Sequence, residues 1–578
     1  MPGVDCLLSN PAKKGKRRIG SSAVTVDLPP TQSERWLDLR TQTSPVIMVK
    51  TVAVIGAGCS GLGAVKSCLE EGLEPTCFEK SDEIGGIWRY KEEVEEGITS
   101  IYKSLVSNTS KEMSCYSDFP TPTDFPNYLP NYKFLEYFKL YADHFGLMKH
   151  IRLKTKVCSV KKCPDFSSSG QWEVVTEKDG KQESAIFDAV LVCSGRYVVP
   201  AFSLESFHGI ERFKGKYFHS REYKHPDGFQ GKRVLVVGVG NSGVDIATEI
   251  SRVATKVFIS SNRGAWVMSR LAEGGYPWDT WITTRFKTWI RLSFPWFVVK
   301  WWIERYLNKR FESSNYGLQR DSSLWKDPLV SDDLPLCIIR GFLSVKPGVA
   351  EFAENSVTFE DGSSEDIDIV IFSTGFLFTF PFLDDSVVKT SNDKVLLYKQ
   401  VFPPELEKPT LAFIGLIQPI GSILVTSEMQ ARWVTRVLKG LNKLPTVEEQ
   451  RKEIAWRSKM ITKRYGTLKG NAFQVDIIEY VDEIASEIGV KPNFFRLLLS
   501  DPRLALEVFF SCCTSPQYRL TGPGKWDGAR NAILTKWDRM LKPMKTRIVK
   551  SKSRRSPLAI VLGLLCLFAL FASIFLFN

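Results

Sequence analysis

One local pattern occurs twice in this 578-residue chain: a short β-branched strand, a Gly-x-Gly-x-x-Gly turn, a helical stretch and a second strand. The first copy begins with the strand 48–55 and the second with the strand 233–237. Glycines at this spacing allow a tight turn, close approach of a pyrophosphate and close packing of the helix, whose first N–H groups bind the phosphates. The motif is weak alone, but with flanking strands and helix each copy predicts a dinucleotide-binding fold.

In the first copy the glycine-rich turn spans residues 56–61 and a helix is predicted over 62–71. The strand that follows, 74–79, ends in an acid, Glu79, eighteen residues after Gly61. A carboxylate at this place accepts hydrogen bonds from the hydroxyl pair of a ribose. The first copy therefore suits a dinucleotide without a 2′-phosphate, such as FAD.

In the second copy the turn spans residues 238–243, and a helix over 244–252 and a strand over 256–259 are predicted. Ser260, Ser261, Asn262 and Arg263 stand where the first copy has its acid. An acid would repel a ribose 2′-phosphate, whereas hydroxyls and an arginine would bind one, so this copy suits NADP. The preference depends chiefly on Arg263, and the alternative is a surface arginine without a ligand. Two such sites favour a flavoprotein reductase or oxygenase, in which one cofactor delivers hydride to the other.

The formal net charge of +13 is concentrated near the two ends of the chain. Residues 1–50 carry 8 basic and 4 acidic groups, and residues 542–555 carry 7 basic groups and no acid. The body between them is close to neutral, which argues against a nucleic-acid enzyme. Residues 1–47 show little periodicity and are expected to be a disordered extension.

The stretch 558–577 contains twenty residues without a charge. As a helix it would be ~30 Å long, the thickness of a bilayer core. A basic linker, 531–557, precedes it, as expected on the cytosolic side of a membrane. We therefore predict a transmembrane tail anchor with the body in the cytosol; the alternative is a buried core helix.

Residues 276–311 contain 12 aromatic side chains, six of them Trp, with 7 basic and 2 acidic groups. Interleaved Trp, Tyr, Lys and Arg are typical of a membrane interface, and the stretch 289–302 has the pattern of amphipathic helices. We expect this stretch to contact lipid; the alternative is a soluble packing subdomain. Stacking on nucleic acid is disfavoured by the predicted anchor.

Several further motifs give the chain, from Met48 to its end, a resemblance to the flavin-containing monooxygenases, in particular the microsomal, drug-metabolising, dimethylaniline N-oxide-forming type. These motifs are Phe213-x-Gly215 with His219 and Tyr223, Gly85-Gly86-Ile87-Trp88, the segment 107–113, Cys193-Ser194-Gly195, Ser373-Thr374-Gly375, Gln430-Ala431-Arg432-Trp433, and Gly522-Pro523-Gly524-Lys525-Trp526.

The resemblance implies a set of cofactor-binding residues. For FAD they are Gly56, Ala57, Gly58, Cys59, Ser60, Gly61, Glu79, Ile87, Trp88, Asn108 and Thr109. For NADP they are Ser107, Gly238, Gly240, Ser242, Gly243, Val244, Asp245 and Arg263. Asn108 is the implied catalytic residue, because an amide donates and accepts hydrogen bonds without a titrating proton. Asn108 also fits an N-glycosylation sequon, which a cytosolic body would not use. His219 and Tyr223 have a simpler role available, which is to brace the turn into the second fold.

By the same resemblance, NADPH reduces FAD, and O2 then forms a C4a-hydroperoxyflavin that oxygenates the nitrogen or sulfur of small apolar amines, thioethers and other xenobiotics. The resemblance also implies an endoplasmic reticulum membrane protein and no bound metal. Baeyer–Villiger oxygenation of ketones and uncoupled NADPH oxidation to H2O2 stay open as alternatives, as does a homo-oligomeric state.

The predicted fold class is α/β, with two nested Rossmann-like domains, an aromatic-rich insertion and the C-terminal transmembrane helix. The FAD-binding domain is expected to be discontinuous, with segments 49–210 and 377–530. The NADP-binding domain, 211–376, interrupts it and contains the insertion at about 264–342. Strands near Val234, Val257 and Val370 are expected to share the inner parallel sheet.

Overall fold

The structure is a computed structural model that describes residues 49–319, 328–384, 386–388, 390–391, 394–466 and 473–547. The predicted N-terminal extension, 1–47, and the predicted anchor, 558–577, lie outside these residues. Within the described part of the chain, no helix is both long and apolar enough to cross a membrane.

The first glycine-rich turn follows the middle strand of a five-stranded parallel sheet in the order β24-β9-β1-β2-β5. Its strands are β1 (Thr51–Ile55), β2 (Glu74–Phe78), β5 (Ile151–Arg152), β9 (Ala189–Val192) and β24 (Leu411–Phe413). The chain order reverses at β1, whose neighbours are β2 on one side and β9 on the other. In open α/β sheets a ligand binds at such a point, beyond the carboxyl ends of the strands.

A second five-stranded parallel sheet, in the order β11-β20-β12-β13-β16, repeats this arrangement around β12. Its strands are β11 (Lys216–His219), β12 (Arg233–Val237), β13 (Lys256–Ser260), β16 (Leu343–Lys346) and β20 (Ile369–Phe372). Val234, Val257 and Val370 lie on three of these strands, so the prediction that they share one sheet is confirmed. The second glycine-rich turn follows β12.

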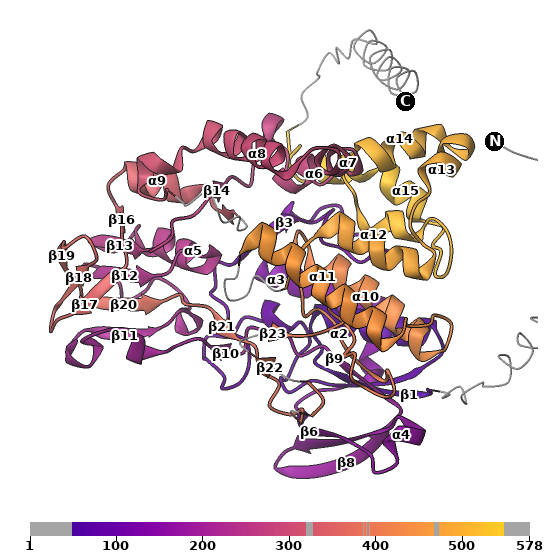
Figure 1. The fold of residues 1–578 in the computed structure, drawn as a ribbon. Helices are drawn as coiled ribbons and strands as arrows, with labels where there is room; N and C mark the ends of the chain where they lie inside the picture. The colour runs from indigo at the N-terminus through magenta and orange to yellow at the C-terminus, as the bar shows by residue number, and fades with distance from the viewer. Residues whose placement is uncertain are drawn as a thin grey trace, which may run out of the picture. The chain divides into compact units, whose positions relative to one another are not determined.

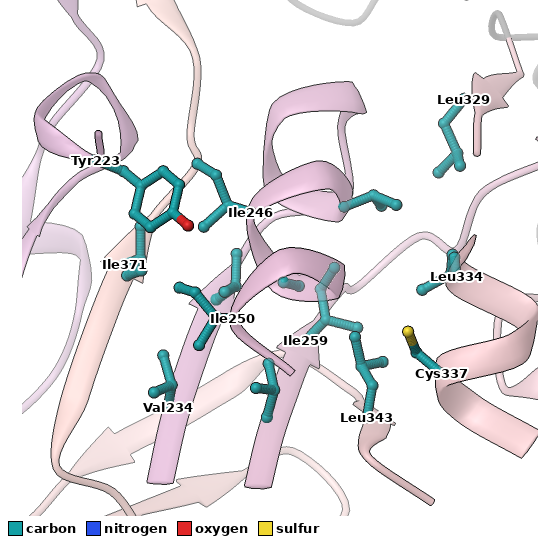
Figure 2. Close-up of a cluster of buried hydrophobic side chains, with 14 of the residues drawn as sticks. Tyr223, Val234, Ile246, Ile250, Ile259, Leu329, Leu334, Cys337, Leu343 and Ile371 are labelled. Carbon is teal, nitrogen blue, oxygen red and sulfur yellow. The ribbon is translucent and has the colours of Figure 1, made fainter. Parts of the chain in front are cut away.

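Apolar side chains from the strands and from the covering helices form the core of each sheet. In the first sheet, Val52 to Val54 of β1 are fully buried, and α2 (Cys59–Glu70) packs on this strand. In the second, Figure 2 shows Ile246 and Ile250 of α5 (Asn241–Ile250) over the sheet, with α9 (Asp333–Ile339) beside them. Each fully buried Ile contributes about 1.5–3 kcal/mol, so these contacts hold each glycine-rich turn at a defined strand end.

The chain enters and leaves the second sheet at neighbouring places. β10 (Val199–Pro200) pairs antiparallel with β21 (Phe376–Leu377), and β24, later in the chain, joins the first sheet. The described residues from Val49 onward form one unit by their contacts, so the domain limits at 210 and 377 stay predictions.

The predicted insertion is largely helical. It contains α6 (Trp278–Ile282), α7 (Arg285–Ser293) and α8 (Trp296–Arg310), as expected from the pattern around residues 289–302. Phe286 of α7 packs against Phe509 and Phe510 of α14 (Pro502–Phe510), and Figure 1 shows the two helices side by side.

The prediction that residues 531–557 form a linker is wrong for the first part of this segment. Here the chain forms α15 (Ala529–Leu534) and α16 (Lys536–Leu541), in which Ile533 and Met540 are fully buried. The carbonyl of Met540 also accepts a hydrogen bond from the Asn127 amide at 3.0 Å. The basic composition of this segment obscured its apolar residues.

The remaining elements that the site uses are β3 (Val106–Ser110), β4 (Tyr128–Pro130), α3 (Asn131–His144), α10 (Ile423–Leu438), α11 (Val447–Tyr465), α12 (Ile477–Ile488) and α13 (Phe494–Ser500). The smaller sheets outside the two central ones include β6 (Lys156–Lys162) with β7 (Trp172–Lys178) and β8 (Lys181–Phe187); β14 (Val267–Met268) with β15 (Leu329–Val330); and β17 (Val349–Phe352) with β18 (Ser356–Phe359) and β19 (Ser364–Asp366).

Candidate functional site

The first glycine-rich turn has no room for side chains at its outer glycines. Gly56 has φ +100°, and a Cβ there would lie 2.8 Å from the carbonyl oxygen of Cys193. A Cβ on Gly61 would lie 1.8 Å from the carbonyl oxygen of Gly56. Both glycines are therefore required by the close approach of α2 to the strands.

The amino terminus of α2 is left uncapped by side chains. Gly58 is its N-cap residue and forms no side-chain cap hydrogen bond. The short helix η1 (Gly86–Trp88) covers the turn: a Cβ on Gly86 would lie 3.0 Å from the Gly58 Cα, and Gly85 N–H donates to the Ala57 carbonyl at 3.0 Å. The free N–H groups of the first helical turn suit a pyrophosphate.

Glu79 lies against this turn and is almost completely buried. One carboxylate oxygen accepts from Ala57 N–H at 2.7 Å, and the other accepts from the N–H and hydroxyl of Ser81 at 2.9 and 2.8 Å. Each oxygen can accept more than one hydrogen bond, so the carboxylate keeps capacity for a ribose hydroxyl. Trp88 stacks on Phe134 of α3, with ring centroids 4.2 Å apart.

The second turn repeats this geometry at its outer glycines and is open at its middle one. A Cβ on Gly238, which has φ +110°, would lie 2.5 Å from the Ser373 carbonyl oxygen, and a Cβ on Gly243 would lie 2.4 Å from that of Gly238. A Cβ on Gly240, the N-cap of α5, would meet no atom within 4 Å. This open, side-chain-free helix terminus has the room and the donors that a dinucleotide phosphate needs.

The other residues predicted for NADP differ in their surroundings. Arg263 is exposed and forms no ion pair with any described residue, and Ser242 is also exposed. Val244 packs in the core of the second sheet, so only its backbone could meet a ligand. Asp245 accepts from the Tyr102 hydroxyl at 2.7 Å, and burial raises the pKa of this carboxyl group.

Asn108, on β3, is half-buried and is contacted by two residues of the insertion. Its side-chain oxygen accepts from the Arg270 guanidinium at 2.7 Å, and its carbonyl accepts from the Trp278 indole N–H at 2.9 Å. Because Arg270 occupies the amide oxygen, the amide NH2 is left to donate elsewhere. Sequence reasoning missed both residues, which lie 162 and 170 positions away along the chain.

The neighbours of Asn108 on β3 are largely occupied within the protein. The Ser107 hydroxyl donates to the Thr109 carbonyl and accepts from Leu129 N–H, both at 2.9 Å. The Thr109 hydroxyl accepts from Ser114 at 2.5 Å. The Lys111 ammonium donates to the carbonyls of Thr123 and Phe125 at 2.8 and 2.7 Å, and burial lowers its pKa to about 8. The hydroxyl of Ser107, a predicted NADP ligand, thus already has two partners within the protein.

His219 and Tyr223 brace the second fold, as predicted. His219 is buried; its Nε2 lies 3.0 Å from the Gly375 carbonyl oxygen, its Nδ1 accepts from Arg221 N–H at 3.2 Å, and burial lowers its pKa to about 4. The Tyr223 hydroxyl donates to Glu249 at 2.9 Å.

The motifs near the C-terminus have a similar bracing role. Arg432, buried on α10, donates to the carbonyls of Tyr518 and Pro523 at 3.2 and 3.0 Å. The Gln430 side chain accepts from Gly415 N–H at 2.8 Å and donates to the Tyr480 hydroxyl at 2.7 Å.

Two parallel sheets, each with a glycine-rich turn and an uncapped helix at the end of its middle strand, define an α/β enzyme with two dinucleotide sites. The chain belongs to the flavin-binding monooxygenase-like family, which it matches over residues 49–578. This confirms the resemblance seen in the sequence motifs.

Similar curated proteins cover nearly the whole chain. It is 57% identical to flavin-containing monooxygenase 1 of dog (Canis lupus familiaris) over 520 residues, 90% of this chain and 97% of the relative. It is 55% identical to flavin-containing monooxygenase 2 of Homo sapiens and to dimethylaniline monooxygenase (N-oxide-forming) 2 of Pan troglodytes, each over 528 residues, 91% of this chain and 99% of the relative. The chain is therefore an enzyme, a flavin monooxygenase that uses NADPH and O2.

Solved structures with the same fold are more distant. The S-allyl-L-cysteine S-oxygenase of Allium sativum aligns with a TM-score of 0.60 at 24% identity, covering 85% of this chain and 99% of the other. A cyclohexanone monooxygenase from Rhodococcus sp. Phi1, solved with NADP+, aligns with a TM-score of 0.54 at 18% identity, covering 76% and 98%.

Proposed function

We propose that the first site holds FAD, that the second holds NADPH, and that the enzyme oxygenates the nitrogen or sulfur of small apolar amines and thioethers. The two sites differ in the charge that follows the second strand. Glu79 at the first favours a ribose with free hydroxyls, and the exposed Arg263 at the second favours a 2′-phosphate. The names of the relatives, which include dimethylaniline N-oxide formation, support amine substrates.

The position of Asn108 is the observation that carries this proposal. When bound, a flavin reduced by NADPH supplies the oxygen-transfer chemistry. Arg270 holds the oxygen of the Asn108 amide, so the amide can offer its NH2 donors to a cofactor without gaining or losing a proton. Buried Trp278 and Asp279 cover this strand against water.

The insertion also contains a surface pocket near Arg270. An open pocket of about 410 Å³ is lined by residues 271–275, directly after Arg270, and by Tyr306, Lys309 and Arg310 of α8. A pocket of this size suits a small ligand rather than a polymer.

Product analysis with NADPH and O2 tests the substrate class. The enzyme is incubated with a tertiary amine, a thioether and a cyclic ketone in parallel, and NADPH consumed, product and H2O2 are measured. We expect N-oxide and sulfoxide in near-stoichiometric yield. Ester formation from the ketone would instead establish Baeyer–Villiger oxygenation, and H2O2 without product would establish an oxidase.

We also propose a tail-anchored protein of the endoplasmic reticulum membrane, with a cytosolic body whose aromatic surface lies on the lipid. This surface comprises exposed apolar side chains of adjacent helices. They are Trp289, Leu292, Phe294, Phe297, Trp301 and Trp302 on or beside α7 and α8, and Phe495, Leu498, Leu499 and Leu506 on α13 and α14. Not all of residues 276–311 belongs to it, since Trp278 and Phe311 are buried. The uncharged stretch 558–577 supports the anchor.

Vesicle flotation separates the two contributions. A chain without residues 556–578 is compared with the same chain carrying Phe297→Ser, Trp301→Ser and Trp302→Ser. The control is Trp456→Ser, which removes an equally exposed Trp from α11. Relative to the full chain, we expect a smaller but measurable fraction of the truncated chain to float, a still smaller fraction of the triple variant, and the same fraction of the control as of the truncated chain. Complete release on truncation would exclude the lipid contact, and unchanged membrane retention on truncation would exclude the anchor as the main attachment.

A further inference from the structure

The helix α6 of the insertion is hydrogen-bonded to β3 at two places, Asn108 itself and Ser110. The Trp278 indole donates to the Asn108 carbonyl at 2.9 Å, and the Asp279 carboxylate accepts from Ser110 N–H at 2.6 Å. Asp279 is only 1% exposed. These two hydrogen bonds fix the backbone immediately around Asn108 from a segment remote in sequence.

The same segment determines where Arg270 lies. The Arg270 carbonyl accepts from Trp278 N–H at 3.0 Å and from the Tyr128 hydroxyl of β4 at 2.5 Å. The side chain of Arg270 then reaches the Asn108 amide oxygen at 2.7 Å. The docking of α6 and the orientation of the Asn108 amide are therefore parts of one hydrogen-bonded arrangement.

The burial of Asp279 lowers the stability of the fold. Its side chain is almost fully buried, and this burial raises the pKa of the Asp279 carboxyl group to about 6. The titratable groups that face it are Tyr128 of β4 and Cys512, which follows α14. Transfer of a carboxyl group from water into the protein interior costs free energy, so an apolar side chain would serve better here if α6 only had to pack.

We propose that Asp279 and Trp278 are positioning residues that hold β3, and with it the Asn108 amide, in the orientation needed beside the cofactor, and so couple the insertion to the flavin site. This inference rests on the proposed role of Asn108. Under this proposal, the aromatic insertion contributes to the reaction site in addition to forming the exposed apolar surface described above.

Four variants of the full chain separate positioning from packing. Trp278→Phe keeps an aromatic ring at this position but loses the indole N–H. Asp279→Ala removes the acceptor for the Ser110 N–H. Asp279→Asn keeps an acceptor oxygen for the Ser110 N–H and removes the charge. Thr280→Val is the matched control, because the buried Thr280 hydroxyl donates only to Pro277, within the insertion, at 2.7 Å.

The first readout is hydrogen–deuterium exchange of peptides covering residues 106–110, with and without added FAD. We expect exchange at least ~10-fold faster in Asp279→Ala than in the wild type, because the Ser110 N–H loses its acceptor. Asp279→Asn and Thr280→Val should exchange like the wild type. Equal exchange in all four variants, or equal acceleration in Thr280→Val, would overturn the proposal.

The second readout is the fraction of consumed NADPH that appears as H2O2. We expect this fraction to rise at least threefold in Asp279→Ala and Trp278→Phe, to return toward the wild-type value in Asp279→Asn, and to stay at that value in Thr280→Val. An unchanged fraction in both variants would overturn the coupling to the flavin site. If the wild-type protein itself does not oxidise NADPH, the proposed function fails, whereas the exchange experiment still decides the positioning.

Discussion

The two glycine-rich turns are nearly identical in backbone geometry and differ in what surrounds them. In both, the first glycine lies against the carbonyl of the residue that follows a neighbouring strand, Cys193 or Ser373, and the third lies against the carbonyl of the first. The middle glycines differ. Gly58 is covered by η1, with a Cβ position 3.5 Å from the Gly86 Cα, while Gly240 faces open space.

This difference indicates that the fold determines where a dinucleotide binds. A few side chains around each turn determine which dinucleotide binds and how tightly. The covered turn, with buried Glu79, suits a cofactor that stays bound. The open turn, with exposed Arg263, suits one that enters and leaves in each catalytic cycle.

The largest effects are expected from matched substitutions of the third glycines. Gly61→Ala should give a protein that purifies without flavin, because its Cβ would overlap the Gly56 carbonyl. Gly243→Ala should retain flavin but lose reduction by NADPH by at least ~100-fold. Flavin absorbance per protein and anaerobic stopped-flow reduction measure the two results. Loss of flavin in both variants would show that the turns are not functionally separate.

A smaller effect is expected from Arg263→Ala, which removes the charge proposed to bind the 2′-phosphate. A lost charged hydrogen bond is worth about 1.5–3 kcal/mol, so KM for NADPH should rise ~10–100-fold while KM for NADH and flavin content stay unchanged. Steady-state kinetics with both nucleotides measure this. Arg252→Ala, at an exposed arginine paired with Asp333, is the control. An equal change with NADH would contradict the assignment.

Glu79→Gln should weaken flavin retention by about tenfold, because it replaces charge-assisted hydrogen bonds by neutral ones. The rate of flavin release on dilution, followed by fluorescence, measures this. KM for NADPH in the flavin-saturated variant should equal that of the wild type, and a rise there would mean that Glu79 does not belong to the first site alone.

The last prediction concerns stability instead of activity and depends on His219, which braces the second fold. Its pKa is lowered from the ordinary value of 6.5 to about 4, so between these values the unfolded chain binds a proton that the folded chain does not. Stability is therefore lost as the pH falls from 6.5 to 4, by up to about 3 kcal/mol. Melting temperatures of the wild type and His219→Gln should diverge at high pH and converge toward pH 4. Parallel curves would contradict the buried neutral imidazole.

The parts of the fold that depend on local sequence could be predicted. Glycine spacing, β-branched strands and the acid at 79 predicted both turns and their sheets, because each unit lies within about 35 consecutive residues. Even the strand limits differ only by a few positions, such as Thr51 instead of Met48 for β1.

The contacts of the insertion with Asn108 could not be predicted. Arg270, Trp278 and Asp279 come near β3 only through tertiary packing, and no local pattern distinguishes Trp278 from the exposed tryptophans that follow it. The composition of residues 276–311 favoured a membrane interface for the whole stretch. This interpretation is wrong for Trp278, which is buried. The one available signal was Asp279, one of only two acidic residues in the aromatic and basic stretch 276–311.

Anaerobic reduction of the bound flavin tests the central claim, that the second turn delivers hydride to a flavin held at the first. NADPH is mixed with the wild-type enzyme and with Gly243→Ala in the absence of O2, and bleaching of the flavin is followed. We predict full bleaching of the wild type by NADPH, and none in the variant on the same timescale although dithionite bleaches both. A wild type that dithionite bleaches but NADPH does not, or equal bleaching of the two proteins by NADPH, would contradict the claim.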